Sequence, residues 1–161
     1  YKPAYSGEED NIANPHRTTE EITAWAPQAA SDVLSFSKED RVSKLNSFKK
    51  YFGSKEGWQL YIGYLEGNKI LGMVDQGYSV GTIVPQVPEI VSRGATGGLY
   101  HWIVRMPLTI GFYTKDAATG NPTPGPSGKF YLFLDIARLA NGGGDDGIGI
   151  VNWRVMDVPK N

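Results

Sequence analysis

The sequence contains no cysteine, and its only histidines are His16 and His101. The lack of cysteine removes the usual ligands of a structural zinc site and the nucleophile of a thiol enzyme. The sequence also lacks an apolar run of about 18 residues, the length that indicates a membrane-spanning helix. We therefore expect no metal site and no membrane-spanning segment within these residues.

The sequence has no excess of charge of one sign. Lys and Arg together number 16 and Asp and Glu together number 17, which gives a formal net charge of -1 at pH 7. Nucleic-acid surfaces derive much of their affinity from Lys and Arg side chains that neutralise phosphates. We therefore expect no direct contact with nucleic acid. The length of 161 residues suits one domain with a tail.

The chain is expected to consist of a polar arm, one domain and a short tail. Residues 1–17 contain two prolines and show no hydrophobic periodicity, which is typical of a tether. A single domain is predicted over residues 18–158. Residues 159–161 form the predicted tail.

The domain is expected to begin with a helix. Thr18 and Glu21 match a T-x-x-E capping box, in which the two side chains accept hydrogen bonds from backbone N–H groups of the first turn. Apolar residues then recur at helical spacing from Ile22 to Leu34. Pro27 cannot donate a hydrogen bond to Thr23, so we expect the helix either to kink there or to begin a few residues later.

Two more helices are predicted downstream. Ser37 is the expected N-cap of the second helix, and Gly53 ends it. The third helix is predicted over residues 56–66, with Gly67 and Asn68 as its stop. The buried side of the second helix is predicted to carry Val42, Leu45, Phe48 and Phe52.

From Ile70 onward the hydrophobic period changes to two, which predicts strands. The clearest strand covers residues 99–113, whose even-numbered positions are all apolar. Pro107 predicts a bulge or an edge position in it. Residues 114–129 are rich in Pro and Gly and predict a long loop. Further strands are predicted at residues 70–75, 78–84, 87–93, 129–139 and 148–155. Helices followed by antiparallel strands define an α+β fold, with about three helices packed on one face of the sheet.

Gly142, Gly144 and Gly147 match the spacing G-x-G-x-x-G of a dinucleotide-binding loop. That loop requires a helix after it, whereas the residues that follow have a strand pattern. Asp145 and Asp146 would repel a pyrophosphate, and they supply too few oxygen ligands for a calcium loop. The stretch therefore predicts a turn between the last two strands, and no cofactor is expected.

Asp135 and His101 are the two candidates for acid–base chemistry. Asp135 lies between Leu134 and Ile136 in a predicted strand, where a carboxylate is unusual. It either lines a cavity as a general base or faces solvent and pairs with Arg105 or Arg138. His101 lies on the polar side of its strand, and no nucleophile motif accompanies it.

The sequence contains four Trp, nine Tyr and six Phe residues, most of which fall on the apolar sides of their elements. Core packing accounts for most of them. A second interpretation is that some form a patch on the helix layer that a partner covers. The candidates for this patch are Tyr51, Phe52, Tyr61 and Tyr64.

Several stretches, in this order, resemble the DotI/IcmL family of type IVB secretion and conjugation systems. They are "ITAWAPQAASDVLSFSKEDR", "KKYFGSKEGWQLYIGYL", "PEIVSRGATGGLYHWIVRMPLTIGFY", and "FLDIAR" followed by "GIGI". The resemblance extends from about Trp25 to Trp153. The sequence departs from the family pattern at Pro27, at the Pro/Gly loop and at "NGGGDD".

The resemblance implies a periplasmic domain of an inner-membrane protein, with a fold like nuclear transport factor 2 and a curved antiparallel sheet. It also implies a membrane anchor that precedes Tyr1, self-association, and contacts with other secretion-channel subunits. Family members are not known as enzymes.

Three functions follow as hypotheses. The first is a non-catalytic scaffold domain of a type IVB secretion or conjugation channel. Its candidate contact surfaces are the aromatic patch, residues 114–129, and the turn at 141–147 with Asp145 and Asp146. The second is a small-molecule-binding protein or acid–base enzyme on the same cone-shaped fold, with Asp135 and His101 in its pocket. The third is a secreted binding module unrelated to a channel.

Overall fold

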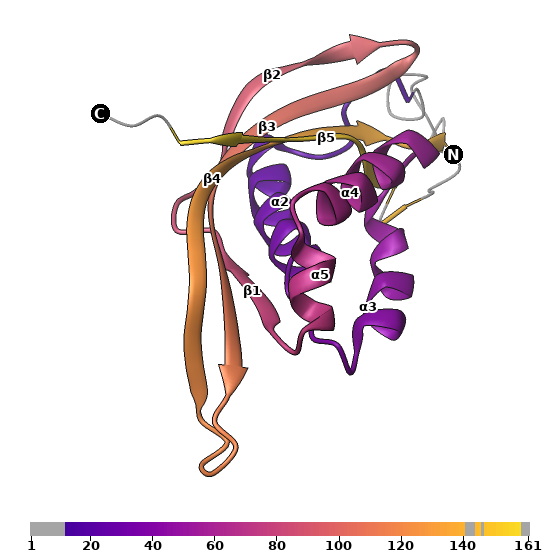
Figure 1. The fold of residues 1–161 in the computed structure, drawn as a ribbon. Helices are drawn as coiled ribbons and strands as arrows, with labels where there is room; N and C mark the ends of the chain where they lie inside the picture. Colours follow the sequence, from indigo (N-terminus) through magenta and orange to yellow (C-terminus); the bar gives the residue numbers. More distant parts are fainter. Residues whose placement is uncertain (1–11, 141–143, 146, 159–161) are drawn as a thin grey trace, which may run out of the picture.

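The computed structural model describes residues 12–140, 144, 145 and 147–158. The first 11 residues of the predicted arm and the predicted tail lie outside the described residues. The described chain runs through helices first and strands afterwards, which is the α+β order expected from the sequence. The helices α2, α4 and α5 lie against one face of a curved sheet (Figure 1).

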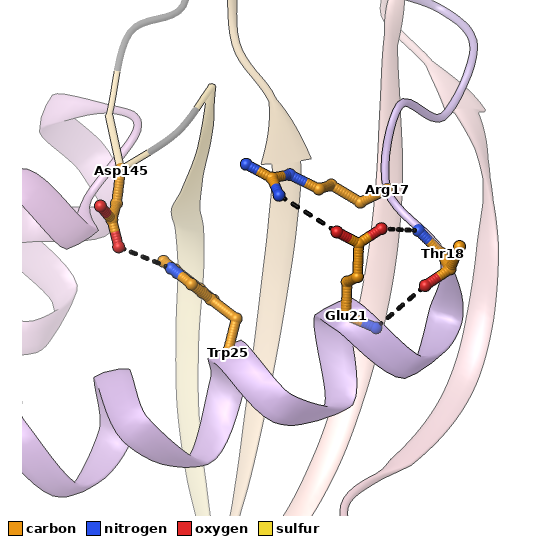
Figure 2. Close-up of polar contacts among 5 residues, drawn as sticks. All are labelled: Arg17, Thr18, Glu21, Trp25 and Asp145. Atoms are coloured by element: carbon orange, nitrogen blue, oxygen red, sulfur yellow. Dashed lines mark hydrogen bonds and ion pairs between the residues drawn. The ribbon is translucent and has the colours of Figure 1, made fainter.

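Helix α2 (Thr19–Val33) starts where the capping box predicts. The Glu21 N–H donates to Thr18 Oγ1 at 3.1 Å, and the Thr18 N–H donates to Glu21 Oε1 at 2.9 Å (Figure 2). This backbone hydrogen bond and the Arg17 guanidinium, 3.2 Å away, hold the pKa of Glu21 below its usual value. Pro27 lies inside the helix, so the alternative of a later start is wrong.

Helix α3 (Arg41–Phe48) begins later than predicted. Asp40 occupies the N-cap position, and its side chain accepts the Ser37 N–H at 2.7 Å. Ser37 therefore lies in the loop before the helix and is not its N-cap. Phe48 is buried as predicted, whereas Val42, predicted on the same side, is 81% exposed. Residues six apart lie about 120° apart around a helix, so the two side chains do not share a face. A short 3₁₀ helix, η1 (Lys49–Tyr51), follows.

Helix α4 (Lys55–Gly67) agrees with the third predicted helix within one residue at each end, and the Ser54 hydroxyl caps it by accepting the Gly57 N–H. The predicted strand at residues 70–75 is wrong. These residues form helix α5 (Ile70–Asp75), which buries Ile70 and Val74, four residues apart on one side.

The sheet is antiparallel throughout the described residues. Its strand order is β1-β3-β4-β5. Strands β1 and β2 share one edge of β3: β2 pairs with residues 99–105 and β1 with residues 109–113. The strands are β1 (Ser79–Ile83), β2 (Glu89–Thr96), β3 (Leu99–Lys115), β4 (Pro122–Arg138) and β5 (Ile148–Asp157).

The sequence predicts a bulge or an edge position at Pro107, and the structure shows neither. Its strand β3 is central, with β4 on one side. On its other edge, β3 pairs with β2 up to Arg105 and with β1 from Thr109 onward. Pro107 lies in the gap between these two partners, where a missing N–H costs no hydrogen bond of the sheet.

Residues 114–129 form the end of a long β-hairpin instead of the predicted loop. Strands β3 and β4 continue almost to the turn at residues 116–121 and extend well beyond the helices (Figure 1). The Asp116 N–H donates to the Asn121 carbonyl. Because antiparallel pairs alternate in hydrogen bonding, Pro122 and Pro124 turn their nitrogens away from β3, toward an edge that β5 does not cover.

The core lies between the helices and the sheet. Along β3 the even-numbered residues from Trp102 to Ile110 are buried, and the odd-numbered ones are half-buried. Strand β5 contains a bulge at Val151, with the buried Ile148 and Ile150 before it and the buried Trp153 after it. Because of the bulge, Val151 does not share a face with Trp153, as a strand that alternates regularly would require.

Candidate functional site

The predicted aromatic patch is a part of the core. Tyr51, Phe52 and Tyr61 are 6%, 8% and 0% exposed, so the prediction of an exposed patch is wrong for these three residues. The Tyr61 hydroxyl donates to the Val33 carbonyl at 2.6 Å, and its ring stacks on Phe52 with centroids 5.0 Å apart. The Tyr51 hydroxyl donates to Asp32. Burial raises the pKa of both tyrosines, which fits their role as packed hydrogen-bond donors.

Tyr64 differs from the other three because it is only half-buried. It lines a groove of about 200 Å³ between α4, α5 and the base of the β3–β4 hairpin. Burial, together with the charge of Asp157, raises the pKa of Tyr64 to about 12. The groove is otherwise lined by apolar residues and by Asn68 and Ser127, so its lining holds no carboxylate, imidazole or amine.

Asp145 holds the turn before β5 against helix α2. Its carboxylate accepts the Trp25 indole N–H at 2.8 Å (Figure 2). Its backbone hydrogen-bonds with that of Ile148. Gly144 and Gly147 both adopt positive φ angles, +70° and +81°, as the turn interpretation requires. The Asp145 carboxylate is therefore used inside the chain. Asp146 lies outside the described residues.

His101 and Asp135 lie together, as the pocket hypothesis requires, but not in a pocket. His101 Nδ1 is 2.6 Å from Asp135 Oδ1, and His101 Nε2 is 3.2 Å from the Thr96 carbonyl oxygen. Asp135 alternates with the buried residues of β4, so it lies on the face of the sheet that is turned away from the helices. Of the two alternatives for Asp135, the one in which it lines a cavity is therefore wrong.

The two arginines that the sequence offered to Asp135 are used elsewhere. Arg105 donates to Glu89 Oε2 at 2.9 Å, and Arg138 donates to the Asn14 carbonyl at 3.0 Å. Both ring nitrogens of His101 face an oxygen atom, one from the Asp135 carboxylate and one from the Thr96 carbonyl. The pair is a part-buried hydrogen bond on the side of the sheet turned away from the helices.

The face of the sheet turned away from the helices, which we call the outer face, was not singled out by the sequence patterns. Its residues are the odd-numbered positions of β3 and β4 and the residues of β5 that pair with them. The registers place them in rows that cross the strands. The three central rows are Pro107–Tyr131–Met156, Glu89–Arg105–Phe133–Arg154 and Ile103–Asp135–Asn152.

Cations stack on aromatic rings within these rows. The Arg105 guanidinium lies 5.3 Å from the centre of the Tyr131 ring, and the Arg154 guanidinium lies 4.6 Å from that of Phe133. Sequence reasoning missed this arrangement because the aromatics were read as core residues. The alternation of Tyr131 and Phe133 with the buried Leu132 and Leu134 is the signal that would have found it.

The described residues contain no group of three or more potential metal ligands and no helix long and apolar enough to cross a membrane.

Solved structures with the same fold include the periplasmic parts of two proteins and a type IV secretion system protein. The periplasmic domain of DotI superposes with a TM-score of 0.75 at 24% identity, covering 88% of this chain and 97% of that one. A periplasmic fragment of TraM gives 0.76 at 17% identity, covering 88% and 98%. An IcmL-like type IV secretion protein from Legionella pneumophila gives 0.72 at 18% identity, covering 90% and 96%.

These similarities define the class of fold: a nuclear-transport-factor-2-like domain with helices on a curved antiparallel sheet, as predicted. No curated protein sequence matches the chain. The model of the DotI/IcmL family, described as an inner-membrane complex component of the type IVb secretion system, matches residues 10–156. The chain belongs to this family, and the resemblance derived from its motifs is confirmed.

Proposed function

We propose that this domain is a non-catalytic scaffold of a type IVB secretion or conjugation channel, acting through contacts with other proteins. One observation carries the proposal: the side of the sheet that faces the helices is filled by buried side chains. Trp102, Met106, Leu132 and Leu134 are at most 1% exposed, so the centre of the cone is a core and offers no substrate cavity. Binding chemistry is left to the outside of the domain.

The alternative of a small-molecule enzyme on this fold has less support. Its two candidate groups, His101 and Asp135, lie on the outer face and hydrogen-bond each other. The groove beside Tyr64 has room for one aromatic side chain, and its lining holds no group that exchanges protons near neutral pH. A pocket enzyme requires convergent acid–base groups, which neither place provides.

The family match supports a particular setting for this scaffold. We place the domain on the periplasmic side of the bacterial inner membrane, held there by a membrane anchor in the full-length protein, and assembling with itself and with other channel subunits. The formal net charge of -1 agrees with protein contacts in place of direct nucleic-acid contacts.

In-cell crosslinking of the full-length protein, followed by mass spectrometry of its neighbours, tests the proposal. We expect crosslinks to other channel subunits and to further copies of the protein in the inner-membrane fraction. A stably expressed protein with no channel neighbour would contradict the scaffold function.

A further inference from the structure

The outer face carries an arginine that has no carboxylate partner. Arg154 is exposed, and no carboxylate of the described residues lies within ion-pair distance of it. The acid in the same row, Glu89, is paired with Arg105, and the acid in the next row, Asp135, is paired with His101. The Phe133 ring supports the Arg154 guanidinium from one side. A guanidinium stacked in this way keeps its N–H groups free at the edge, where they match the two oxygens of a carboxylate.

Apolar surface lies next to this charge. Met156, two residues along β5 on the same face, is 46% exposed, and its row continues through the half-buried Tyr131 and Pro107. Arg, Tyr, Phe and Met are enriched at the centres of protein interfaces. Among the described residues, the three central rows of the outer face therefore combine an apolar strip with one arginine that no carboxylate pairs.

The dimensions of this surface limit what fits on it. Strands lie about 4.8 Å apart, and successive residues on one face are separated by about 6.8 Å along a strand. Four strands and three rows thus span roughly 15 Å in each direction, somewhat more than the diameter of one helix with its side chains. The surface accommodates one secondary-structure element of a partner.

We propose that the outer face docks one amphipathic helix of another channel subunit, whose carboxylate binds Arg154 and whose apolar side chain packs on Met156 and Tyr131. The proposal rests on the scaffold function proposed above and adds the surface and the chemistry of the partner. Two copies cannot dock outer face to outer face through Arg154, because the acids on that face of a second copy are already paired, and we therefore commit to a different protein as the occupant.

Site-specific photocrosslinking in the full-length protein tests the proposal. A photoreactive residue replaces Met156 on the outer face or, as a matched control, Leu60 on helix α4; both positions are 46% exposed. We expect the probe at 156 to capture a channel subunit through a peptide that contains Asp or Glu. The substitution Arg154→Glu should reduce this product about tenfold or more, because a hydrogen-bonded charge pair contributes about 1.5–3 kcal/mol. Arg154→Lys should retain most of it.

Each other outcome overturns the proposal in a distinguishable way. The assigned partner chemistry would be contradicted if the probe at 156 captured only a second copy. It would also be contradicted if Arg154→Glu left the yield of the captured subunit unchanged. Capture of channel subunits from position 60 but none from 156 would remove the outer face and leave the scaffold function standing. Channel subunits captured from neither position would contradict both. Circular dichroism of each purified variant separates loss of docking from loss of folding.

Discussion

Gly57, in the first turn of helix α4, lies against the backbone of strand β5. A Cβ atom at this position would lie 2.6 Å from the Ile150 carbonyl oxygen and 3.1 Å from two backbone atoms of Val151. Backbone atoms cannot rotate away as a side chain does, so the helix or the strand must shift. The same Ile150 oxygen accepts the Gly53 N–H at 2.8 Å, and a shift of the strand weakens that hydrogen bond.

The substitution Gly57→Ala is therefore expected to destabilise the domain. Overpacking costs about 1–3 kcal/mol, and the better helix propensity of Ala returns about 0.5–1 kcal/mol. The net loss of about 1–2 kcal/mol corresponds to a decrease of roughly 2–8 °C in Tm for a chain of this size.

Gly63, in the same helix, provides the matched control. A Cβ atom there meets no atom within 4 Å, so Gly63→Ala gains helix propensity without a clash. We expect its Tm to rise by roughly 1–4 °C. Thermal unfolding of both purified variants, followed by circular dichroism, gives shifts of opposite sign if the close approach is real. A Gly57→Ala variant as stable as the unsubstituted domain would refute the reasoning.

Three further predictions concern stability. Thr18→Ala, which removes the capping box of α2, should lower the free energy of unfolding by about 1 kcal/mol in urea titrations, whereas Thr19→Ala should change it little; equal effects would contradict the capping role. Trp25→Phe removes the N–H that binds Asp145 and should cost about 1–3 kcal/mol in the same assay, and an unchanged midpoint would show that this hydrogen bond contributes nothing. Finally, the raised pKa of Tyr64 means that its hydroxyl loses its proton near pH 10 in the unfolded chain but only near pH 12 in the folded one. The free energy of unfolding should therefore fall as the pH rises through this window. Tyr64→Phe should make that alkaline loss smaller, and a pH dependence identical to that of the unsubstituted domain would contradict it.

Local signals in the sequence were sufficient where one physical requirement dominates. The capping box fixed the start of α2 because its two side chains satisfy backbone donors within four residues. The alternation along residues 99–113 predicted β3 and its buried face, since a long strand with one buried side leaves this pattern. The order of the family motifs predicted the fold class as a whole.

Other elements depended on contacts between distant parts of the chain. Residues 70–75 form an apolar run too short to separate a strand from a helix by period, and the helix results from packing of Ile70 and Val74 in the core. The hairpin end at residues 114–129 has the composition of a loop. Its strand structure comes from cross-strand pairing with β3, which composition does not reveal.

The candidate site residues could be predicted only in part. The sequence singled out Asp135 and His101 but not their mutual contact, because residues 34 apart in the chain meet only through the β3–β4 register. The sequence left Tyr51 and Tyr61 open to core packing or to an exposed patch, because their polar hydroxyls gave no sign of the buried acceptors at Asp32 and Val33. Arg154 became notable only once the registers placed it beside Phe133.

The prolines on the outer edge of the β3–β4 hairpin have a consequence for how copies of the domain can be arranged. Pro122 and Pro124 leave two gaps in the row of donors that a further strand would need. A neighbouring chain therefore cannot extend the sheet along this edge, and open-ended growth into a fibre is blocked there even at high local concentration. A neighbour that contacts this edge of the hairpin must therefore bind it mainly through side chains.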